Sequence, residues 1–347
     1  MSGGVDSSVA AALLVEAGCE VIGVTLRLAG DASRCCSLDD AEDARRVAER
    51  LGIRFYVADY AAAFRREVME PWADAYLAGR TPIPCVACNQ RFKFRHLLER
   101  ARALGAGVVA TGHYARVERD ATSGALRLRR GADAAKDQSY FLFDLGPEQL
   151  ARIRFPVGAL RKDEVRARAR ALGLATAEKP ESQEICFVPG GDHAAVVEAL
   201  RPGAAPGAGD VVDESGRVVG RHGGIHRLTV GQRRGLGIAL GERVFVKSID
   251  AAANRVTVAP AASLGARGAR LSAVSWVAGR PPDGALRARV RVRHRHAGAE
   301  ATVEPAAGGG ARIAFDEAVT AVTPGQAAVF YDGDDVLGGG WIDEALA

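Results

Sequence analysis

The sequence is poor in cysteine, in lysine and in long apolar runs. Its 347 residues include six cysteines, too few and too unevenly placed for a disulfide scaffold, which favours a reducing compartment. No run approaches the ~18 apolar residues of a membrane span, so no contact with a membrane is expected. The first residues show neither a basic nor an apolar leader, so we expect a cytoplasmic protein.

The composition is that of a globular protein. Hydrophobic residues make up 48% and charged residues 25% of the chain, which excludes a disordered protein, and the length predicts two or three domains. Only five of the 46 basic residues are lysine, an imbalance that we attribute to codon bias in a GC-rich genome. The net charge of +4 is too small to indicate nucleic-acid binding by itself, so the distribution of charge has to decide.

The first two-thirds of the chain alternate between helical and strand patterns. This alternation predicts an α/β fold with a parallel sheet covered on both faces. The expected helices span 5–17, 39–51 (with Ser37 as its N-cap), 64–77, 92–104, 147–153 and 162–172, and the expected strands span 20–28, 54–59 and 108–111. A short hairpin is expected at 115–117 and 126–129.

The pattern changes to short alternating segments beyond about residue 200. A Pro/Gly-rich linker at 201–209 precedes them, and together they predict small β-barrels. We therefore expect a nucleotide-binding catalytic domain at 1–195, a small central β-rich domain at 196–260 and a C-terminal β-barrel at 261–347.

A glycine-rich segment, Ser2-Gly3-Gly4-Val5-Asp6-Ser7-Ser8, leads directly into the first helix. Such a turn forms an anion-binding nest at a positive helix end. The lysine of the GxxxxGK[ST] loop is absent, which suits a pyrophosphate leaving group better than transfer of a γ-phosphoryl group. The motif resembles that of the ATP pyrophosphatase (PP-loop) superfamily, whose members adenylate an oxygen; a purely structural Gly-Gly turn is the alternative.

Two cysteines stand in segments suited to chemistry. Cys88 follows a Pro-stiffened loop near the expected start of a helix, where the helix dipole favours the thiolate. Cys85 and Cys88 form a Cys-x-x-Cys pair, but no second pair completes a zinc site, so no protein metal site is predicted. Cys186 lies in a Gly/Pro-rimmed segment, where a buried structural cysteine is the alternative.

Ordered motifs along the whole chain resemble those of the tRNA-specific 2-thiouridylases. They are SGGVDSS (2–8), GRTPIPCVACN (79–89), ATGHYAR (110–116), KDQSYFL (136–142), FPVG (155–158), ICF (185–187), TVGQRRGLG (229–237) and TPGQAAVFY (323–331). The family converts the wobble uridine of certain tRNAs to 2-thiouridine. The resemblance implies a PP-loop domain, a small central domain and a tRNA-binding C-terminal β-barrel.

The resemblance also implies residue roles. Cys88 matches the catalytic nucleophile and Cys186 the cysteine that carries the persulfide sulfur. The implied ATP site comprises Met1, Ser2, Gly3, Gly4, Val5, Asp6, Ser7, Leu26 and Gly112, with Mg²⁺ expected near Asp6. The implied contacts to the flipped base are Ile83, Pro84 and Cys85, and those to the rest of the tRNA are His113, Lys136, Asp137, Gln138, Arg293, His294 and Gln326, for each of which a solvated surface position is the alternative. A relay protein or a cysteine desulfurase is the implied sulfur donor.

The sequence departs from the family pattern at two places. Many relatives carry Asn-Pro-Asp where this chain has Ile83-Pro84-Cys85, and three thiolates at Cys85, Cys88 and Cys186 raise the hypothesis of an iron–sulfur cluster. The chain also starts at the phosphate loop, without the leading strand of its relatives. We expect the loss of a central strand to weaken stability and ATP binding, and an upstream extension to restore them.

Arginine occupies every odd position from 287 to 295. In a strand this spacing places five guanidinium groups on one face, where they repel one another unless an anion covers them. A phosphate backbone is the expected cover, and a solvated strand face is the alternative.

Two other functions are compatible with parts of the sequence. Another PP-loop synthetase acting on a small molecule, such as argininosuccinate synthetase, has no use for the two cysteines or the arginines. An RNA-binding protein with a decayed ATP site has no use for an intact loop.

Overall fold

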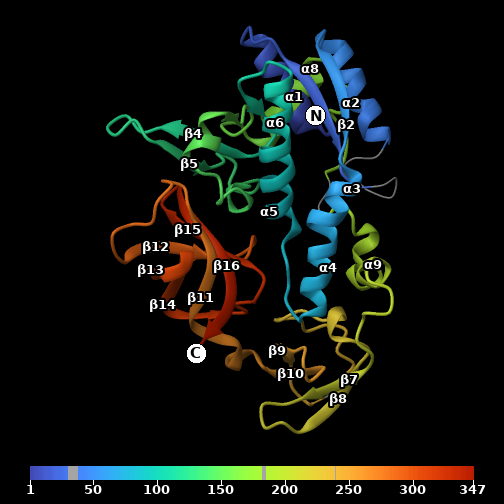
Figure 1. The fold of residues 1–347 in the computed structure, drawn as a ribbon, viewed down its shortest axis with the longest axis vertical. Coiled ribbons are helices and arrows are strands. Elements are labelled where there is room, and N and C mark those ends of the chain that lie inside the picture. Colours follow the sequence, from blue (N-terminus) through green and yellow to red (C-terminus); the bar gives the residue numbers. More distant parts are fainter. Residues whose placement is uncertain (30–37, 182–184, 239) are drawn as a thin grey trace.

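The computed structural model describes residues 1–29, 38–181, 185–238 and 240–347, so the expected cap at residue 37 lies outside the described residues. The N-terminal part contains two parallel strand pairs (Figure 1). Strand β1 (Ile22–Arg27) pairs with β2 (Arg54–Asp59), and β3 (Val109–Ala110) pairs with β6 (Ile153–Arg154). The same part of the chain contains the helices α1 (Val5–Glu16), α2 (Leu38–Leu51), α7 (Pro147–Ala151) and α8 (Lys162–Ala171).

A cavity of about 900 Å³ lies between β1 and β3, lined by residues of both strands and of α1. Within the described ranges, no strand joins β1 to β3. Met1 lies beside β1: its amino group donates to the Val24 carbonyl, and Thr25 Oγ1 donates to the Met1 carbonyl at 2.7 Å. The expectation of a strand before the loop stays a prediction.

Two long helical runs cross the middle of the molecule. The first combines α3 (Ala61–Phe64), a π-helical stretch (Arg65–Met69) and α4 (Glu70–Leu77). The second combines α5 (Pro84–Cys88), a π-helical stretch (Asn89–His96) and α6 (Leu97–Ala103). The second run starts well before the expected residue 92, because Pro84 at its first position has the backbone angle that a helix start needs. Helix α9 (His193–Leu200), which the sequence analysis missed, packs on α4.

The central domain is a four-stranded sheet in the order β8-β7-β10-β9. Its own core includes Ile225, Val246 and Val256. The bounds are β7 (Gly209–Val212), β8 (Val218–His222), β9 (Val244–Asp250) and β10 (Arg255–Pro260).

Short 3-10 turns occur in all three domains, at Ser139–Phe141, Pro189–Gly191, Ile225–Arg227, Ala261–Leu264 and Ala307–Gly309.

The C-terminal domain is a closed six-stranded barrel, which confirms the predicted class. Its strands follow the order β11-β14-β13-β12-β15-β16, and β16 returns to pair with β11. The bounds are β11 (Gly265–Trp276), β12 (Leu286–Arg291), β13 (Ala299–Ala306), β14 (Gly310–Thr320), β15 (Ala327–Asp332) and β16 (Asp335–Leu346). Val290, Ile313 and Phe330 are fully buried in its core.

The hairpin of β4 (Ala115–Arg119) and β5 (Leu126–Arg130) joins the barrel sheet, although it belongs to the N-terminal part of the sequence. β5 pairs with β16, and the same hydrophobic core contains Tyr140 from the N-terminal domain and Val329 from the barrel. The barrel is therefore fixed to the catalytic domain by a shared core.

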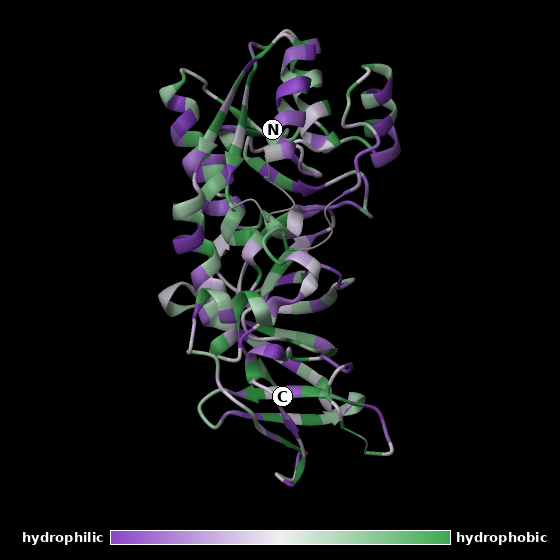
Figure 2. Ribbon diagram, turned by 90° about the vertical axis from the view of Figure 1, so that its right-hand side faces the viewer, coloured by the Kyte–Doolittle hydropathy of each residue, from purple (hydrophilic) through white to green (hydrophobic). Residues whose placement is uncertain are grey.

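Hydrophilic and hydrophobic residues are interspersed along the helices at the N-terminal end (Figure 2). In α2, Ala44, Val47 and Ala48 are buried, as expected for a helix that covers a sheet with one face, whereas α1 is largely apolar and buried. Among the helices of the described part of the chain, none has the length and apolar composition to cross a membrane.

Candidate nucleotide and thiol site

The phosphate loop forms a tight turn at the start of α1. Gly3 has φ +66°, and a Cβ there would lie 2.3 Å from the Asp40 carbonyl oxygen, so the turn requires glycine. Gly4 is the N-cap residue of α1, and as a glycine it has no side chain that could bond to the helix N–H groups. The Ser7 and Ser8 hydroxyls donate to the Gly4 carbonyl at 3.1 Å and 2.9 Å. The loop thus leaves its helix terminus available to an anion, as a polyphosphate requires.

Gly112 holds the loop from the opposite side. A Cβ at Gly112 would lie 2.6 Å from the Asp6 carbonyl carbon and from the Ser7 nitrogen. The cavity between β1 and β3 is lined by most of the expected ATP-site residues: Met1, Ser2, Asp6, Ser7, Leu26 and Gly112. The structure therefore brings together around one cavity residues that are far apart in the sequence, and their role in binding ATP stays a prediction.

The Asp6 carboxylate is the centre of a polar network. Lys162 Nζ lies 2.7 Å from Asp6 Oδ1 and 2.9 Å from Oδ2, and the Tyr114 hydroxyl donates to Oδ1 at 2.7 Å. Lys162 Nζ also lies 2.7 Å from Glu181 Oε1, and Lys136 Nζ lies 2.7 Å from Glu181 Oε2. Burial acts to raise the pKa of Glu181, but the bonds from Lys136 and Lys162 outweigh it and lower that pKa.

Four of the five lysines surround the loop. Lys93 lines the cavity, Lys136 and Lys162 hold Glu181, and Lys179 Nζ lies 2.7 Å from Asp40 Oδ1 beneath Gly3. Codon bias therefore does not account for where the lysines lie, and Lys93, Lys162 and Lys179 were not among the expected site residues. The signal that points to them is the scarcity itself, because Lys and Arg are not interchangeable where a compact ammonium is needed.

The two expected reactive cysteines pack against one hydrophobic cluster. Cys88 and Cys186 both contact the core that contains Phe64, Phe92 and Phe187. The Phe64 ring centroid lies 5.4 Å from that of Phe92 and 5.8 Å from that of Phe187. Phe92 lies close to Cys88 in the sequence and Phe187 follows Cys186 directly. Two segments nearly a hundred positions apart therefore meet at Phe64. Leu26, which lines the nucleotide cavity, belongs to the same cluster.

The position of Cys88 in its helix differs from the expected one. The helix begins at Pro84, so the first turn contains Cys85, which is exposed, while the half-buried Cys88 lies at the end of α5. Ile83 has an extended backbone and precedes the helix, and Pro84 is buried. The segment that is predicted to contact the flipped base therefore lies at the start of the helix, and that contact stays a prediction.

Among the described residues, no three or more His, Cys, Asp or Glu side chains are arranged to hold a metal ion. Cys85, Cys88 and Cys186 are all described, so the donor set for an iron–sulfur cluster is not assembled and we derive no step from one. Mg²⁺ differs, because it binds through one or two carboxylates together with substrate phosphates. Asp6 on the phosphate loop fits that requirement.

His113 and Gln138 are held inside the catalytic domain. His113 Nδ1 lies 2.6 Å from Thr111 Oγ1, and burial, with the Lys93 charge, holds the pKa of His113 well below its usual value. His113 is therefore neutral at pH 7 and lines the nucleotide cavity. Gln138 Oε1 accepts a bond from the Tyr114 N–H at 3.0 Å.

Three of the other expected tRNA contacts, Asp137, His294 and Gln326, lie where the barrel meets the N-terminal domain. Arg291 Nη1 lies 3.3 Å from Asp137 Oδ2, and the His294 ring centroid lies 4.6 Å from that of Phe141. Gln326 Nε2 donates to the Thr81 carbonyl at 2.8 Å. These bonds position the barrel, and contact with tRNA stays a prediction for each residue.

The prediction of one strand face with five arginines is wrong. Strand β12 ends at Arg291, and Arg293 Nη1 donates to the Thr320 carbonyl at 3.0 Å. Arg289 pairs with Glu300, its cross-strand neighbour on β13, and Arg287 pairs with Asp316 of β14, two strands away in the barrel. Protein carboxylates therefore supply much of the cover that was expected from phosphate.

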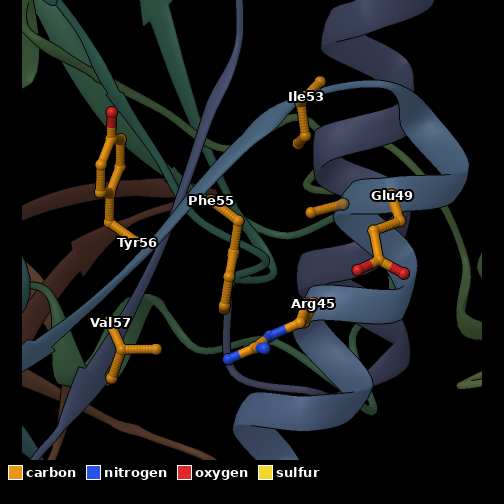
Figure 3. Close-up of a pocket in the computed structure, with 7 residues that line it drawn as sticks. Arg45, Glu49, Ile53, Phe55, Tyr56 and Val57 are labelled. Atoms are coloured by element: carbon orange, nitrogen blue, oxygen red, sulfur yellow. The ribbon is translucent and has the colours of Figure 1, made fainter.

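A second pocket of about 500 Å³ lies against the outer strand β2, and it contains none of the expected site residues. Figure 3 shows Arg45 and Glu49 of α2 facing Phe55, with Tyr56 on the opposite side of the strand.

A phosphate loop at the start of α1, followed by a β-sheet domain and a β-barrel, defines a nucleotide-dependent enzyme of the HUP class. The tRNA methyl transferase HUP domain matches residues 1–190, the tRNA methyl transferase PRC-barrel domain residues 200–260, and the aminomethyltransferase beta-barrel domain residues 266–342. The structure of an NMN synthetase from Francisella tularensis is similar over 52% of this chain and 63% of its own, with TM-score 0.33 and 19% identity.

Curated relatives match over nearly their full length. The chain is 51% identical to the tRNA-specific 2-thiouridylase of Geotalea uraniireducens, covering 100% of this chain and 94% of that protein. It is 51% identical to that of Geobacter metallireducens (100% and 96%) and 49% identical to that of Solibacter usitatus (99% and 98%). The chain belongs to the tRNA-specific 2-thiouridylase family.

Proposed function

We propose that the protein catalyses the ATP-dependent 2-thiolation of the wobble uridine of tRNA. The observation that carries the proposal is the shared position of Leu26, which lines the cavity of the phosphate loop and packs in the cluster that Cys88 and Cys186 contact. The cavity of the phosphate loop and the two cysteines thus share one hydrophobic cluster, which supports the proposal. The relatives are named for this activity.

The arrangement suits a two-stage reaction. The C2 carbonyl of uracil is a poor electrophile, and transfer of AMP to its oxygen with release of pyrophosphate creates a leaving group. The terminal sulfur of a Cys186 persulfide then attacks C2, or is released by Cys88 and attacks as sulfide. On the first route, loss of AMP leaves C2 joined to Cys186 through a disulfide, and the Cys88 thiolate attacks Cys186 Sγ, which breaks that bond and frees the 2-thiouridine. On the second route, the attack of Cys88 on Cys186 Sγ frees the sulfide, which then displaces AMP from C2. Formation of a Cys88–Cys186 disulfide balances the electrons, and an external reductant restores both thiols.

Specific residues serve each stage. The loop N–H groups at the start of α1 bind the phosphates, and Asp6 would hold the Mg²⁺ that offsets their charge. Ile83, Pro84 and Cys85 face the flipped base at the helix start that leads to Cys88. The persulfide sulfur comes from a relay protein or a cysteine desulfurase.

Serine variants of the two cysteines test the proposal. Cys88→Ser and Cys186→Ser should each abolish 2-thiouridine formation in an assay with tRNA, ATP, Mg²⁺ and a persulfide donor, measured by nucleoside mass spectrometry. Affinity for tRNA should hardly change, because phosphate contacts supply most of it. Ser215→Ala, at an exposed serine of the central domain, is the control and should retain activity.

A wild-type rate in either active-site variant would contradict the persulfide assignment. ATP–pyrophosphate exchange that needs a small substrate, ignores tRNA and survives thiol alkylation would instead support a small-molecule synthetase.

A further inference from the structure

Two sequence motifs that the proposed reaction does not use meet in the structure. The segment 79–82 links α4 to α5, and the loop 323–326 of the barrel precedes β15. The Thr81 N–H donates to the Pro324 carbonyl at 2.9 Å, and Gln326 Nε2 donates to the Thr81 carbonyl at 2.8 Å. The barrel therefore holds both backbone polar groups of a residue that lies just before the expected base contacts.

Arg80 adds a charged contact between the same two parts of the chain. Its Nη2 donates to Asp343 Oδ1 at 2.9 Å and to the Ile342 carbonyl at 3.2 Å, both on β16. The side chains of this ion pair are 38% and 35% exposed, so the pair is half-buried against the barrel. Gly325 lies against the segment as well: its φ is +91°, and a Cβ there would lie 3.1 Å from Arg80 Cβ. The backbone angle and the close approach both favour glycine at this position.

The beginning of the segment contacts the central domain. Gly79 has φ +72°, and a Cβ there would lie 2.9 Å from the Cγ2 atom of Ile249 on β9. Thr81, two positions later, is buried. The segment therefore contacts the central domain and the barrel at neighbouring residues, before it leads into the helix that ends at Cys88.

We propose that Arg80 is a positioning residue for thiolation: through its pair with Asp343, the barrel sets the place of the helix that bears Cys88 and of the base contacts before it. The inference rests on the proposed function, because it requires the flipped base and the Cys88 thiol to meet. Residues 80–82, which the structure describes, belong to neither helix nor strand, so contacts with the barrel fix their position. A displacement of ~1 Å at a reacting group can cost about 100-fold in rate.

The proposal predicts a loss of rate without a loss of affinity. Arg80→Met keeps the apolar stem and removes every donor, and Asp343→Asn removes the partner charge. Each should lower the single-turnover rate of 2-thiouridine formation, at saturating tRNA and ATP, by about 3- to 5-fold, as expected for a half-exposed ion pair. Arg80→Met should lose more, because it also loses the bond to the Ile342 carbonyl. The Kd for tRNA should stay within about twofold of wild type, because phosphate contacts supply most of the affinity.

Exchange of the two charges tests whether the pair itself is responsible. Arg80→Glu places a second carboxylate beside Asp343 and should be slower than Arg80→Met. Addition of Asp343→Arg to Arg80→Glu restores an ion pair of reversed sense and should recover part of the rate. The double variant Arg80→Met with Asp343→Asn should be no slower than Arg80→Met alone, because both residues act through one contact.

Nucleoside mass spectrometry of single-turnover reactions and filter binding of tRNA, both with the full chain, measure these quantities. Glu344→Gln is the matched control, because Glu344 follows Asp343 on β16 but pairs within the barrel, with Arg270 at 3.3 Å. It should keep the rate and the affinity of wild type. If Arg80→Met does not fold, Asp343→Asn and the charge exchange carry the test.

Wild-type rates in both Arg80→Met and Asp343→Asn would overturn the inference, as would an equal loss of rate in Glu344→Gln or no recovery after the charge exchange. Parallel losses of rate and of tRNA affinity would show that the pair only maintains the structure of the barrel, and would also overturn it. Wild-type protein that forms no 2-thiouridine would overturn the proposed function as well. Active wild type with unaffected variants overturns this inference alone.

Discussion

Asp144 should make the stability of the protein depend on pH with an unusual sign. Burial raises the pKa of this carboxyl from 3.8 to about 7. Between these values the folded protein retains a proton that the unfolded chain has released, so the free energy of unfolding falls as pH rises. About three pH units at ~1.4 kcal/mol each give a loss of about 4 kcal/mol between pH 4 and pH 7, with no further loss above the folded pKa.

Asp144→Asn should remove this loss, because the amide does not ionise. We expect the variant to match wild type near pH 4 and to exceed it by up to about 4 kcal/mol at pH 8, reduced by the cost of burying an amide. Urea unfolding followed by tryptophan fluorescence across pH 4–8 measures the difference. Asp283→Asn, at a side chain that is 97% exposed, is the control. Parallel pH curves for wild type and Asp144→Asn would refute the reasoning.

Two further predictions concern ligand binding. Gly112→Ala should weaken ATP binding by at least ~10-fold, because its Cβ would lie 2.6 Å from the loop backbone. The control Gly107→Ala, whose Cβ would meet nothing within 4 Å, should bind ATP as wild type does. Equal ATP affinities of the two variants in a titration would contradict the prediction. Arg289→Ala should leave the salt dependence of tRNA binding nearly unchanged, because Glu300 already neutralises Arg289. Arg295→Ala should lower the slope of log K against log salt by just under ~1. Filter binding in a salt series measures both slopes, and a larger effect of Arg289→Ala would support the prediction that phosphates cover the arginines of this strand.

The sequence by itself determined the features that depend on neighbouring residues. The strand expected at 54–59 is β2 with the same bounds, and the helix expected at 5–17 is α1 within one residue. The change to all-β structure after residue 200 was also predictable. Alternation, helical periodicity and glycine turns act over a few residues, so they can be recognised without knowledge of the fold. The SGGVDS motif is of this kind, since its loop and helix are contiguous.

Only the tertiary structure decided which distant residues share a site. Lys162 and Glu181 reach the loop because α8 packs on α1, and no spacing in the sequence encodes that contact. The arginines of β12 alternate as expected, but the acids that neutralise them come from β13 and β14 of a closed barrel. The hairpin at 115–130 likewise joins the barrel only because its strand β5 pairs with β16. Local patterns specify an element and its buried face, whereas the partner of a charged side chain depends on how separate elements pack, and that is a property of the whole chain.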